Sequence, residues 1–241
     1  MRWLGFATAV LALAAGGCGD AAEADEAPLL VFAASSLREV ALELDFEAEY
    51  VFAGSDELAA QIRDGADADV ILSASEQPVA DLESAGLVEE RVPFASNRLV
   101  IVVPRSNPAD VGEFADLARG GMKLVLGGEG VPIGDYAREA LAAAGLEAAL
   151  DNVVSLEEDV KGVLGKVALD EADAGIVYST DARAAGEDVR VVEIPGAAQP
   201  KVRYFAAVVT AGDRDAADAY LDLLLGEEGV RTLTAAGFGP R

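Results

Sequence analysis

The chain has 241 residues, of which 52% are hydrophobic, so it can bury a sizeable core and is not intrinsically disordered. Its 43 acidic residues outnumber its 18 basic residues, and the net charge of −25 excludes nucleic acid as a partner, because that binding depends on Lys and Arg. The sequence contains no histidine, which excludes Ser-His-Asp and Cys-His catalysis.

Residues 1–18 predict a lipoprotein-like signal peptide. The apolar run from Trp3 to Ala15 is too short for an ordinary membrane span and suits the apolar region of a leader. Cys18, the only cysteine, follows two glycines, where a bacterial lipoprotein carries its lipid. Plain secretion stays open, because Ala15 stands where a larger aliphatic residue is usual. Residues 19–28, rich in Ala, Asp and Glu, predict a tether. We therefore expect a periplasmic or extracytoplasmic protein whose only membrane contact is an N-terminal lipid anchor.

From residue 29 onward, short apolar runs alternate with amphipathic helical ones, which predicts an α/β protein. The expected strands are 29–34, 48–53, 69–74, 98–103, 123–127, 174–178, 189–194 and 202–209. The expected helices are 36–44, 56–64, 76–85, 113–119, 134–144, 158–171 and 214–236. Strands 98–103 and 202–209 are long and almost wholly apolar, as buried or domain-crossing strands are. They divide the chain into two outer segments and a middle one.

Ligands of α/β sheets bind at the carboxyl ends of strands, where the next helix begins. Four such junctions are distinctive: Ser35-Ser36, Ser55, the glycine-rich turn 127–136 with Pro132 and Gly134, and the segment 155–160 that is expected to open the sixth helix. The sequence has no nucleophile elbow, no Ser-x-x-Lys pair and no phosphate loop. Carboxylate catalysis and a hard-metal site stay formally open, but no spacing nominates a set of residues. Hydroxyls and backbone N–H groups remain, and these are the donors of an oxyanion receptor.

The adjacent serines Ser35 and Ser36 have two interpretations. Ser36 and Glu39 fit a capping box, which needs one serine. Alternatively, the polarised N–H groups at the start of the helix hold an anion, and the serines assist. Ser55 as a plain N-cap and Tyr178 as a half-buried core tyrosine are the corresponding alternatives at the other junctions.

Seven segments, in register over nearly all of residues 29–241, resemble the periplasmic molybdate-binding proteins of ABC transporters. They are FAASSL (32–37), FAGSDELAAQI (52–62), DADVILSAS (67–75), VPIGDYAREAL (131–141), EDVKGVLGKV (158–167), EADAGIVYSTDA (171–182) and AAGFGP (235–240). The resemblance implies a two-lobed type II periplasmic binding protein fold. Each lobe would be a mostly parallel sheet flanked by helices, and two crossing strands would join the lobes. Residues 29–100 and 206–241 would form lobe I, and residues 101–205 lobe II.

The resemblance also implies a site between the lobes. Ser36 and Ser55 would donate hydroxyl and backbone N–H hydrogen bonds from lobe I. Ile133 and Val160 would donate backbone N–H groups from lobe II, and Tyr178 would donate its phenolic O–H. Ser35 would be structural. Many members of the family carry alanine at the position of Ile133, so the pocket could be narrower here.

The implied function is capture of molybdate and tungstate by a monomer that delivers the anion to an ABC transporter permease, without catalysis or a cofactor. Molybdenum would be bound as an oxyanion and not as a free metal ion. Molybdate carries no proton at neutral pH, so a site made of donors suits it. Phosphate keeps a proton and would leave a buried polar group unpaired, at a cost of about 1–3 kcal/mol. The alternatives are a receptor for sulfate, thiosulfate or phosphate, a non-binding sensory or structural lipoprotein, and a carboxylate-based hydrolase.

One departure from the family lies between Leu37 and Tyr50. The segment is short and predicts a first helix of about two turns before the second strand begins. We expect this helix to cover less of its sheet than the family's longer one does.

Overall fold

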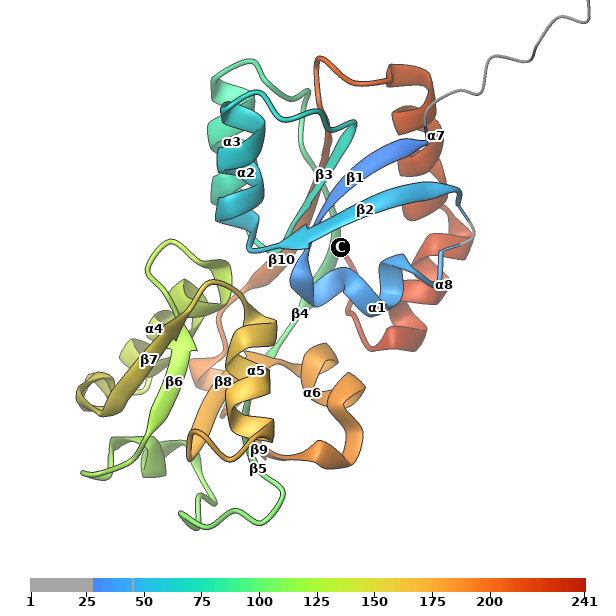
Figure 1. The fold of residues 1–241 in the computed structure, drawn as a ribbon. Helices are drawn as coiled ribbons and strands as arrows, with labels where there is room; N and C mark the ends of the chain where they lie inside the picture. The colour runs from blue at the N-terminus through green and yellow to red at the C-terminus, as the bar shows by residue number, and fades with distance from the viewer. Residues whose placement is uncertain (1–27, 45) are drawn as a thin grey trace, which may run out of the picture.

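The computed structural model describes residues 28–44 and 46–241, which form two lobes stacked one above the other (Figure 1). The expected signal peptide 1–18, its Cys18 and residues 19–27 of the expected tether lie outside the described residues. Among the residues that the structure describes, no helix has the length and apolarity needed to cross a bilayer.

Ten strands and eight α-helices make up the described fold. The strands are β1 (Leu29–Ala34), β2 (Ala48–Ala53), β3 (Val70–Ser73), β4 (Val92–Asn97), β5 (Leu99–Pro104), β6 (Leu124–Gly127), β7 (Val153–Glu157), β8 (Ala174–Tyr178), β9 (Val189–Glu193) and β10 (Val202–Val208). The helices are α1 (Arg38–Ala41), α2 (Ser55–Arg63), α3 (Glu76–Ser84), α4 (Pro132–Ala143), α5 (Val160–Ala168), α6 (Ser179–Ala185), α7 (Arg214–Leu225) and α8 (Glu227–Ala236). Short 3-10 turns are η1 (Ser35–Leu37), η2 (Phe114–Ala118), η3 (Glu147–Asn152), η4 (Gly186–Asp188) and η5 (Gly196–Ala198).

Each lobe is built on one five-stranded sheet, and the two sheets follow the same plan. The first has the order β2-β1-β3-β10-β4 and the second β7-β6-β8-β5-β9. In each sheet three parallel strands are followed by one strand, β10 or β5, that runs antiparallel to both of its neighbours. The expected two-lobed α/β architecture with mostly parallel sheets is therefore confirmed.

The chain crosses between the sheets at two short segments. The outward crossing is Arg98, between β4 and β5, and the return runs through residues 194–201. The two apolar strands expected to cross each lie within a single sheet, and they are apolar because central strands are covered on both faces. The sheets therefore change over slightly before the expected lobe boundaries at 100/101 and 205/206.

Gln199 ties the return segment to the outward crossing. Its Nε2 donates to the Leu99 carbonyl oxygen at 2.7 Å, and its Oε1 accepts from the Leu99 N–H at 2.9 Å. One amide side chain thus satisfies both backbone groups of the first residue of β5, which joins the two crossings side by side.

Three elements of the structure were not expected, and one expected helix is divided in two. β4, β7 and α6 were not expected, because β4 contains Pro93 and polar residues and β7 alternates exposed with half-buried positions at a sheet edge. The expected helix 214–236 is two helices, which meet at Gly226, where a Cβ would lie 2.8 Å from the Asp222 carbonyl oxygen.

The first helix is as short as its sequence predicts, since α1 is a single turn that follows η1. Aromatic side chains pack beside it and α7. The Phe46 ring meets the fully buried Tyr220 ring edge-on at 5.2 Å, and the Tyr50 hydroxyl donates to the Tyr220 hydroxyl at 3.4 Å. Phe46, Tyr50 and Tyr220 thus form an aromatic cluster between the segment that enters β2 and helix α7.

Candidate functional site

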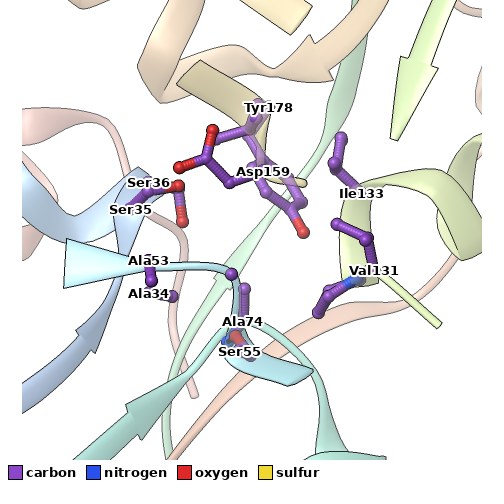
Figure 2. A pocket seen from close by; sticks show the side chains of 13 residues that line it. Ala34, Ser35, Ser36, Ala53, Ser55, Ala74, Val131, Ile133, Asp159 and Tyr178 are labelled. Atoms are coloured by element: carbon purple, nitrogen blue, oxygen red, sulfur yellow. Dashed lines mark hydrogen bonds between the residues drawn. The ribbon is translucent and has the colours of Figure 1, made fainter. Parts of the chain in front are cut away.

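A small cavity lies between the lobes, where the carboxyl ends of the parallel strands of both sheets face each other. It encloses about 210 Å³, including its open mouth, and the five predicted site residues Ser36, Ser55, Ile133, Val160 and Tyr178 all line it. Ser35 lines it as well. Figure 2 shows the serines on one side, Ile133 across from them, and the Tyr178 side chain reaching in from the second lobe. The structure therefore brings the predicted residues together, while their role in binding stays a prediction.

Three helices direct their N-termini at this cavity. Gly54 precedes α2 and Val131 precedes α4, and neither residue has a side chain that can cap a helix. The first N–H groups of a helix have no partner within it and lie at the positive end of its dipole. In α5, Asp159 caps the helix by accepting from the Gly162 N–H at 2.8 Å, which leaves the Val160 N–H to the cavity.

Two glycines bring the N-terminus of α4 close to β6. A Cβ at Gly134 would lie 2.2 Å from the Gly128 carbonyl oxygen, so only glycine allows this close backbone approach. A Cβ at Gly127 would lie 2.8 Å from Cγ2 of Ile133. The isoleucine side chain therefore packs over a glycine, and its backbone N–H stays at the cavity.

The first lobe holds its two hydroxyls with hydrogen bonds inside the protein. Ser55 Oγ accepts from the Ala74 N–H at 3.0 Å, and because a backbone N–H can only donate, Ser55 keeps its own proton for donation. Ser36 Oγ lies 3.0 Å from the Tyr204 hydroxyl. Both serines are buried, so each is fixed in place before any ligand is considered.

The capping interpretation of the serines is wrong. Ser55 is the first residue of α2 and follows its cap, and Ser36 lies inside η1. Glu39 does not reach back to Ser36, because its carboxylate accepts from Lys161 of the other lobe at 2.8 Å. Residues 155–160 lead into a helix as expected, since Asp159 is the cap of α5 and Val160 its first residue, while Ser155 itself lies in β7.

Tyr178 is the unpaired donor of the second lobe. Its side chain is 1% exposed, and its hydroxyl has no hydrogen-bond partner among the described residues. Burial raises the pKa of Tyr178 well above its ordinary value, so the hydroxyl keeps its proton and acts as a donor. A buried hydroxyl without a partner costs about 1–3 kcal/mol, which an acceptor in the cavity would remove.

The hydrogen-bond donors of the cavity are all neutral groups, although the expected ligand is an anion. Among the described residues that line it there is no lysine or arginine, and Asp159 is the one charged side chain. The Asp159 carboxylate uses its Oδ1 to cap α5. The other polar groups of the lining are hydroxyls and N–H dipoles, which match ligand oxygens that only accept hydrogen bonds.

The two lobes touch around the cavity. A Cβ at Gly54 would lie 2.5 Å from the Glu158 carbonyl oxygen of the other lobe. Lys161 lies between lobes, with its ammonium 2.8 Å from Glu39 and 2.9 Å from the buried Asp181 carboxylate. Although burial lowers it, these two carboxylates raise the pKa of Lys161 above its usual value. The lobes are thus in close contact at Gly54, and the Lys161–Glu39 ion pair joins them.

The chain belongs to the bacterial extracellular solute-binding protein family, whose model matches residues 29–239. This is a family of transport receptors, which confirms that the chain is not an enzyme and places it outside the cytoplasm.

Among its relatives, the chain is similar to the molybdate-binding protein ModA of Mycobacterium tuberculosis, with 34% identity over an alignment of 261 positions, gaps included, that covers 99% of each chain. Its fold is similar to that of the periplasmic molybdate-binding protein of Azotobacter vinelandii, with a TM-score of 0.77 and 19% identity over 88% of this chain and 99% of the other. It is also similar to the sulfate-binding protein SubI of M. tuberculosis, with a TM-score of 0.73 and 19% identity over 88% and 86%. The fold alone therefore does not distinguish these two anions.

Sequence reasoning did not find several residues that shape the site. Gly54, Asp159 and Ala74 line the cavity, and Tyr204 contacts Ser36 from β10. Gly54 and Asp159 stand beside predicted site residues at strand-to-helix junctions, so position alone could have nominated them. Tyr204 lies inside an apolar strand, where a tyrosine carries no signal of a role in binding.

Proposed function

We propose that the protein captures molybdate, and also tungstate, in the cavity between its lobes and delivers the anion to the permease of an ABC transporter. The observation that carries the proposal is the unpaired buried hydroxyl of Tyr178, which lies across the cavity from the two anchored hydroxyls of Ser36 and Ser55. The similarity to ModA over the whole chain supports molybdate as the anion.

The donor set favours a fully deprotonated anion. Molybdate, tungstate and sulfate offer only acceptors, whereas hydrogen phosphate offers a proton that needs an acceptor. The described lining groups act as donors, apart from the Asp159 carboxylate that already caps α5. Selection of molybdate over sulfate then depends on size, because the two anions share charge and shape. Sulfate is the second candidate ligand, on the strength of the fold shared with SubI.

Calorimetric titration of the purified, ligand-stripped protein with molybdate, tungstate, sulfate and phosphate tests the proposal. We expect one-to-one binding of molybdate and tungstate, and measurable but much weaker binding of phosphate. A receptor held at a hundredfold excess over its dissociation constant gains about 2.7 kcal/mol of stability, which a thermal melt detects independently. Tight binding of sulfate without binding of molybdate would identify sulfate as the ligand. The absence of binding by all four anions would refute the proposal.

We propose further that Cys18 carries the lipid anchor and that the receptor acts as a monomer. Cells that express Cys18→Ser should release the protein from the membrane fraction, while the wild-type protein stays bound. Membrane retention of the Cys18→Ser protein would contradict the anchor, and sedimentation at a dimer's mass would contradict the monomer.

A further inference from the structure

The orientation of the Asn97 side-chain amide follows from its hydrogen bond with the backbone N–H of Arg98. The Arg98 N–H lies 2.9 Å from one end of the Asn97 amide, and the Ser179 hydroxyl lies 3.0 Å from the same end. Since a backbone N–H can only donate, that end must be the oxygen. The nitrogen of the amide then faces Thr180 Oγ1 at 2.9 Å and the Tyr204 hydroxyl at 3.4 Å.

The direction of the next hydrogen bond follows. Tyr204 is fully buried on β10, and its hydroxyl accepts a hydrogen bond from Asn97. Burial raises the pKa of Tyr204 far above its ordinary value, so the hydroxyl keeps its proton. The one remaining partner for that proton among the described residues is Ser36 Oγ, 3.0 Å away. Ser36 therefore accepts from Tyr204, and its own proton is left to point into the cavity.

We infer that Asn97 and Tyr204 are positioning residues that make Ser36 an obligate hydrogen-bond donor, and that they thereby set the receptor's discrimination against protonated oxyanions. The inference rests on the proposed function and deepens it by naming the residues that exclude hydrogen phosphate and hydrogen arsenate. An unsupported Ser36 hydroxyl can rotate and accept the proton of such an anion. A Ser36 hydroxyl that already accepts from Tyr204 presents its proton instead.

The test is a double-mutant cycle on Ser36 and Tyr204, read by calorimetry with molybdate and hydrogen phosphate in mildly alkaline buffer. In that buffer both ligands are dianions, so a general change in charge cancels from their affinity ratio. We expect Tyr204→Phe to weaken molybdate binding by up to about tenfold, the effect of one hydrogen bond between neutral groups, and to leave hydrogen phosphate binding equal or stronger. In the Ser36→Ala background, Tyr204→Phe should change the molybdate dissociation constant by less than about twofold.

Tyr220→Phe is the matched control, because Tyr220 is also a buried tyrosine, and its hydroxyl meets Tyr50 away from the cavity. It should change neither dissociation constant by more than about twofold. Equal losses from Tyr204→Phe with and without Ser36 would mean that Tyr204 acts through packing, and would overturn the inference.

Asn97→Asp provides a second route in case Tyr204→Phe does not fold. A carboxylate cannot donate to Tyr204, so the hydrogen-bond order should reverse and leave a Ser36 lone pair at the cavity. The molybdate-to-phosphate affinity ratio should then fall by more than tenfold, and an unchanged ratio would overturn the inference. Failure of the wild-type protein to bind any oxyanion would refute the proposed function together with the inference. If the wild-type protein binds molybdate but the molybdate-to-phosphate affinity ratio is unchanged in the variants, the inference alone is refuted.

Discussion

The two walls of the cavity, one formed by each lobe, hold their hydroxyl groups in different ways. In the first lobe, Ser36 and Ser55 are hydrogen-bonded to Tyr204 and to the Ala74 N–H, so this half of the site is complete on its own. In the second lobe, Tyr178 is buried without a partner among the described residues. In the proposed function, an anion therefore meets hydroxyls that the first lobe already holds in place, and it supplies the hydrogen-bond partner that Tyr178 of the second lobe lacks.

The largest effect is expected from Gly54→Ala, which breaks the contact between the two walls. Its backbone angles, φ −62° and ψ 144°, suit alanine, and within the first lobe the new Cβ would meet only the end of the Asp56 side chain, at 2.8 Å, which must turn aside. The new Cβ would meet the Glu158 carbonyl oxygen, and overpacking of about 1–3 kcal/mol should weaken molybdate binding by up to about a hundredfold. Calorimetry measures the affinity, and small-angle scattering should show a more open molecule. Gly165→Ala, with open space around its Cβ, is the control. Unchanged affinity in Gly54→Ala would show that the lobes need not close this tightly.

Ser55→Ala should damage the organised wall both with and without ligand. It removes a donor to the anion, which should weaken binding about thirtyfold, and it leaves the Ala74 N–H without its acceptor. The ligand-stripped protein should therefore lose about 1–3 kcal/mol of unfolding free energy in urea. If only binding fell, Ser55 would not support its own lobe, and the contrast between the walls would weaken.

Tyr178→Phe should weaken binding without lowering stability, in contrast to Ser55→Ala, which should lower both. Loss of the donor should weaken molybdate binding about tenfold. The ligand-stripped protein should keep or gain stability, because the variant removes a buried hydroxyl that has no partner among the described residues. Urea unfolding of the two variants side by side gives the result: a loss of stability in Tyr178→Phe similar to that in Ser55→Ala would refute the comparison.

Glu39→Gln should have a small effect on affinity, because it weakens an ion pair at the edge of the interface. Glu39 is half exposed, and such pairs contribute about 0.2–1 kcal/mol, so molybdate binding should weaken no more than about threefold to fivefold. Glu43→Gln removes the same charge one turn further along the chain and should leave the affinity unchanged. A loss above tenfold in Glu39→Gln would mean that the ion pair dominates closure.

The second lobe also contains Asp181, a fully buried carboxyl, and here the expected effect concerns stability alone. Burial raises the pKa of Asp181 to about 6, against the opposing effect of the Lys161 ammonium. The folded state therefore holds this proton more tightly than the unfolded state, whose pKa is near 4. The contribution to stability is present below about pH 4 and is lost as the pH rises to about 6. Asp181→Asn should remove this part of the pH dependence of urea unfolding, and an unchanged profile would assign it to other groups.

Local patterns in the sequence predicted the parts of the molecule that depend on local physics. Apolar runs marked the buried strands, and the strand-to-helix junctions marked where Ser36 and Ser55 would lie. The position of Tyr178 in the cavity followed from the resemblance to a family, because a tyrosine at a strand end has no distinctive signal. The hydrogen bond from Tyr204 to Ser36 joins residues far apart in the chain, and no local pattern reports such a contact.

Elements at the edges of the sheets were the hardest to predict. β4 and β7 carry polar side chains or proline, since an edge strand needs less apolar cover, and so they do not stand out as apolar runs. The break at Gly226 was missed because a single glycine is tolerated inside many helices. The start of α8 packs closely on the end of α7, since a Cβ at Gly229 would lie 2.3 Å from the Leu224 carbonyl oxygen.

The two hydrogen bonds between Gln199 and Leu99 have a consequence for how the motion of the lobes can be measured. Because Gln199 joins the return segment to the first residue of β5, we expect the lobes to open by rotation about this one hinge. A motion with one degree of freedom is described by one distance. A donor and acceptor dye on α3 and η2, at opposite ends of the molecule, would therefore turn the receptor into a fluorescent reporter of its anion, with the signal proportional to occupancy.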